Sequence, residues 1–239
     1  MAIQTRSVDY IHAGTALEGF FAYDDSRTQP LPAVLVSHAW MGRDSFVCGK
    51  ALKLAELGYA AFALDMYGKG IIGSGPEENA RLMQPFMADR ALLQSRVVTA
   101  LDTLRLQPEV DGRRIAAMGF CFGGLCVLDL ARTGADLRGV ASFHGLFVPP
   151  GNTRGNRIKA KVLAMHGFDD PMAPPEQLVA LGRELTEAGA DWQIHAYGNT
   201  VHAFTNPQAN DRAFGTVYDP TADRRSWQSL RDFLAEVLN

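Results

Sequence analysis

The sequence feature that most constrains the fold is the run Gly119-Phe120-Cys121-Phe122-Gly123-Gly124. Residues 114–118 before it are typical of a short buried strand, and residues 125–131 after it are typical of an apolar helix. Glycines on both sides allow a sharp strand-to-helix turn, because a Cβ there would strike neighbouring backbone. The pattern is a cysteine version of the G-x-S-x-G turn that exposes a nucleophile. We therefore predict that Cys121 is a nucleophile, held in a strained conformation at a helix N-terminus that favours a thiolate.

Composition restricts the class of protein and its partners. The 239 residues are 47% hydrophobic, enough for one α/β domain or two small ones. A formal net charge of −3 without a basic run argues against nucleic acid or an anionic membrane as a partner. We find no stretch of transmembrane length and no apolar signal-peptide core. Three cysteines without metal or redox spacing argue against a disulfide framework, so we expect a cytoplasmic protein.

Predicted strands alternate with predicted helices along the chain. Residues 3–10 and 17–23 favour an antiparallel edge, and the predicted inner strands span 33–38, 59–65, 114–118, 139–144, 161–166 and 192–197. Helices are expected up to Leu57 and over 77–106, 125–131, 176–188 and 226–238, with Pro85 as the candidate break in the longest. This alternation predicts a doubly wound, mostly parallel sheet in one domain, residues 1–239. The short connection near residues 146–159 leaves no cap domain and indicates an open cleft for small substrates.

Two segments downstream of Cys121 carry candidate partners for it. In α/β hydrolases the nucleophile is followed along the chain by an acid and then by a histidine base. Asp169 and Asp170 both follow the predicted strand that ends near His166, and either carboxylate could be the acid. His202 lies in the loop after the last inner strand and could turn toward Cys121. A base is needed because a free thiol is mostly protonated at neutral pH.

The whole chain resembles the dienelactone hydrolase family of α/β hydrolases. The residues that carry the resemblance are Leu64-Asp-Met-Tyr-Gly68, the run around Cys121, the Asp170 loop and His202-Ala-Phe-Thr-Asn-Pro207. The resemblance implies an α/β-hydrolase fold and hydrolysis of small carboxylic esters or lactones, with no cofactor and no metal. It implies Cys121 as nucleophile, His202 as base and Asp170 rather than Asp169 as acid. The pattern H-G-x-x-D-x-x-x-P, from His166 to Pro174, is what selects Asp170.

The resemblance also bears on the oxyanion hole and on the substrate. The fold uses the backbone N–H of the residue after the nucleophile, here Phe122, and the family match gives Trp40 as the second donor. The best-known members carry a glutamate where this chain has Ala39, so we expect Cys121 to pair directly with His202. Members that bind the dienelactone carboxylate place an arginine where this chain has Asn206. The dienelactone itself is therefore left open as the substrate.

The remaining candidates concern substrate binding. Tyr67, Arg81, His144 and Phe204 are predicted to contact a small ester or lactone, although Phe204 could equally be core and Arg81 a solvated charge. Phe122 could be core, and His38 and His166 are expected to be structural or to line the pocket. The alternative functions are a general carboxylesterase or thioesterase, or a non-catalytic small-molecule receptor on the same fold. A monomer or a small homo-oligomer is expected.

Overall fold

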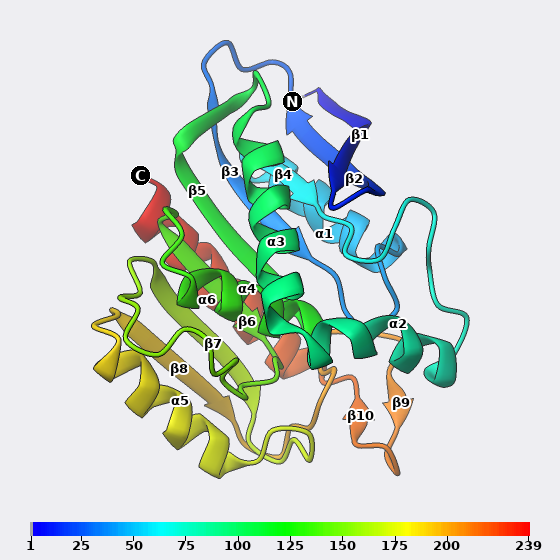
Figure 1. Ribbon diagram of the computed structural model, residues 1–239, viewed down its shortest axis with the longest axis vertical. Coiled ribbons are helices and arrows are strands. Elements are labelled where there is room, and N and C mark those ends of the chain that lie inside the picture. The colour runs from blue at the N-terminus through cyan, green and yellow to red at the C-terminus, as the bar shows by residue number, and fades with distance from the viewer. Residues whose placement is uncertain (1) are drawn as a thin grey trace.

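A computed structural model describes residues 2–239 and shows a mixed sheet between two layers of helices (Figure 1). The strands are β1 (Ile3–His12), β2 (Thr15–Asp24), β3 (Leu31–Ser37), β4 (Ala60–Ala63), β5 (Val110–Phe120), β6 (Gly139–Phe143), β7 (Lys161–Gly167), β8 (Trp192–Tyr197), β9 (Asn210–Asp211) and β10 (Thr216–Val217). The helices are α1 (Ser45–Glu56), α2 (Pro76–Ala88), α3 (Arg90–Arg105), α4 (Phe122–Arg132), α5 (Pro175–Glu187) and α6 (Pro220–Leu238).

The main sheet has eight strands in the order β1-β2-β4-β3-β5-β6-β7-β8. From β4 to β8 neighbouring strands run parallel, whereas β1 and β2 form the antiparallel edge expected from the sequence. All four residues of β4 and all five of β6 are buried, as expected for strands covered on both faces. This topology confirms the predicted α/β-hydrolase fold.

Each face of the sheet has its own hydrophobic core. On one face α3 and α4 pack with side chains such as Leu101 and Leu125, and α5 adds Leu181 (Figure 1). On the other face α1 and α6 contribute Leu54 and Phe233. The fully buried central strands between these two layers are rigid, so their carboxyl ends provide fixed positions for functional loops.

The structure differs from the sequence prediction at two helix boundaries. The long helical region breaks at Asp89 and not at Pro85, which lies inside α2. The reason is capping, because the Asp89 carboxylate accepts the N–H groups of Ala91 and Leu92 at 3.0 Å and starts α3. Helix α6 begins at Pro220, six residues before the predicted start at Ser226. The short hairpin of β9 and β10 was not predicted.

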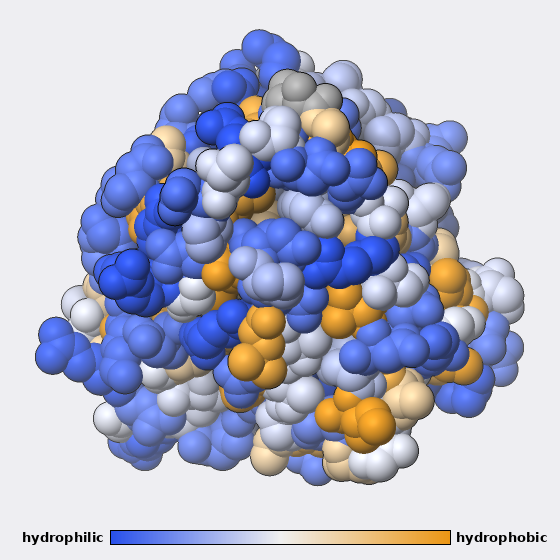
Figure 2. Space-filling view, turned by 90° about the horizontal axis from the view of Figure 1, so that it is seen from above, coloured by the Kyte–Doolittle hydropathy of each residue, from blue (hydrophilic) through white to orange (hydrophobic). Residues whose placement is uncertain are grey.

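The connection from β6 to β7, residues 144–160, contains no helix or strand. No helix among residues 2–239 has both the length and the apolar character needed to cross a membrane. The face seen in Figure 2 is mainly hydrophilic, with hydrophobic residues scattered in small groups. Such scattered groups are ordinary for a protein surface and indicate no particular partner.

Candidate active site

The turn at Cys121 is formed where β5 ends and α4 begins. Cys121 has φ 54° and ψ −116°, a conformation that is strained for a residue with a side chain. The turn is possible because Gly119 packs against the Gly123 carbonyl, and a Cβ at Gly123 would stand 2.6 Å from the His38 carbonyl oxygen. The sequence prediction of a strained turn is therefore confirmed, and Cys121 stands at the carboxyl edge of the sheet.

The two backbone N–H groups predicted to bind an oxyanion make no hydrogen bond within the described residues. Neither the Phe122 nor the Trp40 amide has an acceptor among residues 2–239. The Trp40 loop is held in place from below, because the Tyr67 hydroxyl donates to the Trp40 carbonyl at 2.9 Å. His38 also fixes this loop, since Nδ1 donates to the Ala39 carbonyl at 2.6 Å. The two amides come from different segments, the Trp40 loop after β3 and the start of α4, and their role as oxyanion donors stays a prediction.

Asp170 is the carboxylate that reaches His202. Its Oδ2 lies 2.6 Å from His202 Nδ1, and its Oδ1 accepts the Met172 N–H at 2.8 Å. Both side chains are buried. Asp169, the alternative acid, is exposed, and its side chain makes no hydrogen bond or ion pair with His202. Because a carboxylate is an acceptor only, Nδ1 of His202 carries a proton toward Asp170 whether the ring is neutral or charged.

Tertiary packing brings the Asp170 and His202 loops together. They approach so closely at Gly167, at the end of β7, that a Cβ there would stand 2.7 Å from the Val201 carbonyl oxygen. The hairpin of β9 and β10 then holds the His202 backbone on its other side. His202 N–H donates to the Gly215 carbonyl at 3.0 Å, and Val217 N–H donates to the His202 carbonyl at 3.1 Å. The imidazole position is therefore fixed by two loops and a hairpin.

Cys121 lies beside His202 without a hydrogen bond of ordinary distance and angle between them. His202 Nε2 is buried and has no such hydrogen-bond partner among the described residues. Burial alone would lower the pKa of His202, but its interactions with Cys121 and with the Asp170 carboxylate outweigh burial and raise that pKa to about 10. Cys121 is thus close enough to affect the protonation of His202, and their direct pairing stays a prediction. Catalytic hydrogen bonds are often long before substrate binds.

Three further histidines lie at strand ends near the site, and we call His38, His144 and His166 the strand-end histidines. Burial is the main cause that lowers the pKa of each, so they are neutral. His144 Nε2 lies 2.8 Å from Thr205 Oγ1, and its ring contacts the His202 ring edge-on at 5.1 Å. Residues 2–239 contain no group of three or more metal-ligating side chains placed to hold a metal ion.

A cavity of about 280 Å³ opens at Cys121. His144 and His202 line it, together with hydrophobic side chains of which Trp40 and Phe214 are stacked at 5.9 Å between ring centroids. The sequence also suggested Met41 as part of an apolar pocket, and Met41 does line the cavity; residues that sequence reasoning missed include Asp44, Phe46, Met83, Phe120, Leu146, Met172 and Phe214. They come from separated loops and helices, and no local pattern marks them.

Three of the four predicted substrate-binding residues do not line this cavity. Arg81 is exposed, lies 3.3 Å from Glu78 and faces a separate surface hollow. Tyr67 supports the Trp40 loop, and Phe204 is fully buried behind His144. His144 is the one that the fold brings to the cavity, because it directly follows β6 next to the Cys121 strand.

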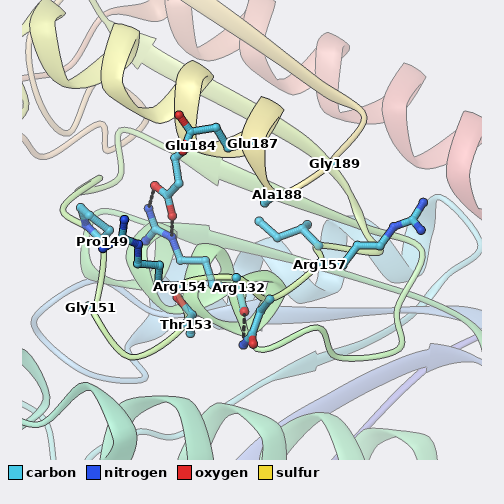
Figure 3. Close-up of a pocket in the computed structure, with 13 residues that line it drawn as sticks. Arg132, Pro149, Gly151, Thr153, Arg154, Arg157, Glu184, Glu187, Ala188 and Gly189 are labelled. Atoms are coloured by element: carbon cyan, nitrogen blue, oxygen red, sulfur yellow. Dashed lines mark hydrogen bonds and ion pairs between the residues drawn. The ribbon is translucent and has the colours of Figure 1, made fainter.

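A larger cavity of about 820 Å³ lies away from Cys121, between the β6–β7 connection and the end of α5 (Figure 3). Figure 3 shows Arg132 pointing toward Glu184, with 2.7 Å between Nη2 and Oε2. Arg132 also lies 3.0 Å from Asp129, so two carboxylates already neutralise its guanidinium. This cavity shares no residue with the one at Cys121 and fills the space left by a connection without a helix.

Comparison with known proteins identifies relatives over nearly the whole chain. The sequence profile described as "Dienelactone hydrolase family" matches residues 17–238. A solved structure described as a dienelactone hydrolase-like promiscuous phosphotriesterase from metagenomic libraries has 38% identity and a TM-score of 0.94, with 100% of both chains covered. An Aquifex aeolicus protein named "Putative carboxymethylenebutenolidase" is 26% identical over 87% of this chain and 89% of its own length. A Bradyrhizobium protein named "Probable 2-oxo-3-(5-oxofuran-2-ylidene)propanoate lactonase" is 26% identical over 98% of this chain and 96% of its own length.

Proposed function

The chain belongs to the dienelactone hydrolase family of hydrolases, and from that premise we propose that it hydrolyses small carboxylic esters or lactones. The proposed catalytic residues are Cys121 as nucleophile, His202 as base and Asp170 as the acid that orients His202. One observation carries the proposal. His202 Nδ1 lies 2.6 Å from Asp170, while its Nε2 is unpartnered beside a cysteine in a strained turn.

Acylation is the first half of the proposed reaction. The Cys121 thiolate attacks the carbonyl carbon, a C–S bond forms, and the carbonyl electron pair moves to the oxygen. The N–H groups of Phe122 and Trp40 donate to this oxyanion, and each such donor contributes about 10²–10³ in kcat in other hydrolases. The intermediate collapses with cleavage of the C–O bond, and the His202 imidazolium protonates the leaving alkoxide. The product is a thioester at Cys121.

Deacylation restores the resting site. Neutral His202 takes a proton from water as the water oxygen attacks the thioester carbonyl. The second tetrahedral intermediate expels the Cys121 thiolate and releases the carboxylic acid. His202 is then again an imidazolium between a thiolate and Asp170. No step needs a cofactor.

The test is hydrolysis of p-nitrophenyl acetate and of an unsaturated lactone by wild type, Cys121→Ala and Cys48→Ala. Cys121→Ala is expected to lose turnover of both substrates. Its circular dichroism spectrum is expected to match that of the wild type, which would show that the fold is intact. Cys48→Ala is the matched control, since Cys48 is another partly buried free cysteine, outside the cavity, and is expected to keep full activity. Undiminished hydrolysis by Cys121→Ala would refute the assignment. A thioester substrate in the same panel separates a thioesterase from an esterase on the same residues.

A second candidate function is hydrolysis of neutral phosphotriesters. It is favoured by the 38% identity with the solved relative described as a promiscuous phosphotriesterase. The same thiolate would displace an aryloxide from phosphorus, and the same two amides would bind the phosphoryl oxygen. Turnover of a diethyl aryl phosphate that is lost in Cys121→Ala would support it, and release of a single equivalent of phenol without turnover would contradict it.

A further inference from the structure

The cavity at Cys121 is lined mainly by hydrophobic side chains, with one carboxylate and a few neutral polar groups from Thr205, Asn206 and Thr216 beside the reacting groups. Four aromatic side chains line it, from Trp40, Phe46, Phe120 and Phe214, and three methionines complete the apolar wall. Asp44 is the only aspartate, glutamate, lysine or arginine among its described lining residues. Beyond the reacting pair of Cys121 and His202, a substituent that enters the cavity therefore meets aromatic faces and one carboxylate, that of Asp44.

The cations nearest in sequence to Asp44 are engaged elsewhere. Arg43 directs its guanidinium to Glu18, with 2.6 Å between Nη2 and Oε1. Lys50 lies behind the aromatic wall, 3.7 Å from Asp223, and is almost fully buried. Neither residue lines the cavity. No described lysine or arginine is therefore placed to neutralise Asp44 from within the cavity.

Asp44 is held in a fixed position by its second role. It is the N-cap of α1, where its Oδ1 accepts the Val47 N–H at 3.1 Å. The helix dipole reduces the field of this carboxylate but does not reverse it, because a helix N-terminus carries about half an elementary charge. Its Oδ2 accepts no hydrogen bond from the described residues. One oxygen thus stays available to a ligand beside the aromatic rings.

We propose that this cavity selects substrates by charge, and that Asp44 is the specificity-determining residue. The site takes neutral and positively charged esters and disfavours esters that carry a carboxylate in the group bound by the cavity. A carboxylate would meet like charge, whereas an ammonium group would be attracted both by Asp44 and by the aromatic faces. This inference rests on the proposed ester hydrolysis and goes beyond it to the class of substrate.

The test compares three acetate esters of similar size at low ionic strength. They are the esters of choline, of neutral 3,3-dimethylbutanol and of 3-hydroxypropanoate, and kcat/KM is measured by pH-stat. We expect kcat/KM for the cationic choline ester to be at least equal to that for the neutral ester, and kcat/KM for the neutral ester to exceed that for the anionic ester. Asp44→Asn removes the charge and keeps a good N-cap. Removing one partly exposed charge should change kcat/KM for each charged ester about two- to fivefold, in opposite directions for the cation and the anion. The ratio of kcat/KM for the cationic ester to that for the anionic ester should therefore fall at least about fourfold from wild type to Asp44→Asn.

Asp89→Asn is the matched control. Asp89 is also an N-cap, on α3, and it is exposed and outside the cavity. The same chemical change there should leave the ratio of kcat/KM values unaltered. High salt should compress the wild-type ratio, because screening weakens partly exposed charges.

A second measurement keeps charge selection separate from ester hydrolysis. Cationic aminoethyl and anionic sulfonatoethyl methanethiosulfonate modify Cys121 without turnover, and mass spectrometry assigns the modified cysteine. We expect the cation to react faster than the anion in wild type, and Asp44→Asn to narrow that difference. Equal rates for the two reagents, or an Asp44→Asn ratio that matches wild type, would overturn charge selection. Clear charge selection here with no hydrolysis of any ester would overturn the proposed function alone.

Discussion

Asp170→Asn is the substitution that most directly tests the proposed site. In the wild-type protein the Asp170 carboxylate accepts hydrogen bonds from two donors, the Met172 N–H at 2.8 Å and His202 Nδ1–H at 2.6 Å. An asparagine has one oxygen and one NH₂ group, so it can accept from only one of them. If it keeps the turn at Met172, its NH₂ group faces Nδ1 and forces the proton onto Nε2. The histidine is then in the wrong tautomer to act as a base.

The expected magnitude follows from this geometry. A carboxylate-to-amide change at this position of a triad costs about 10⁴-fold in kcat, which corresponds to about 5 kcal/mol. The pKa of His202 should fall, because Asp170 is one of the two charges that raise it against burial. Stability should fall as well, by about 1.5–3 kcal/mol for a buried hydrogen bond to a charged group.

The assay combines kcat for an activated ester from pH 5 to 10 with thiolate ultraviolet absorbance at neutral pH. Asp170→Asn should lose both activity and thiolate absorbance, since the imidazolium that pairs with the thiolate is no longer stabilised. Asp169→Asn is the control, because this neighbouring carboxylate is exposed and does not contact His202. The reasoning is wrong if folded Asp170→Asn keeps more than a tenth of wild-type kcat, or if Asp169→Asn loses as much.

Three further predictions concern the support of the site. Tyr67→Phe removes the hydroxyl that holds the Trp40 carbonyl at 2.9 Å, and should lower kcat about tenfold with little change in KM; an unchanged kcat would contradict this role. Gly124→Ala places a Cβ 2.6 Å from Ser142 Oγ and 2.8 Å from backbone of the next loop, and should cost about 1–3 kcal/mol in urea unfolding; equal or greater stability would show that the loop yields. The strand-end histidines have lowered pKa values, so below pH 6.5 the unfolded chain binds more protons than the folded protein does. The free energy of unfolding should therefore fall by up to about 1.4 kcal/mol per pH unit for each of them, and a constant value between pH 6.5 and 5.5 would refute this. His202 has a raised pKa and is protonated in both states below pH 6.5, so it adds nothing to this loss.

The cavity and the catalytic residues constrain the reaction in different ways. The arrangement of Cys121, His202 and the two free amides serves acyl transfer in general. In our proposal, the aromatic wall and Asp44 of the cavity select which acyl or alcohol groups reach these residues. The substrate-binding arginine of some family members has no equivalent here, because Arg81 is exposed and paired with Glu78 and position 206 is asparagine.

The features that the sequence alone determined are those set by neighbours along the chain. Glycines around Cys121 allow the strained turn, and fully apolar runs such as residues 139–143 indicate strands buried on both faces. Chain order then gave one nucleophile, one base and two competing acids. These inferences succeed because a turn, a strand or a helix cap depends on a few adjacent residues.

Only the tertiary structure decided which side chains meet. It directed Tyr67 to the Trp40 carbonyl and brought Asp44 and Phe214 to the cavity from distant segments. It also placed Asp170, which the family pattern had favoured over Asp169, against His202. No local pattern encodes these contacts, because they depend on how strand ends converge and on which carbonyls approach which glycines. The family and the fold were therefore predictable from the sequence, while the shape and charge of the cavity at Cys121 depend on packing.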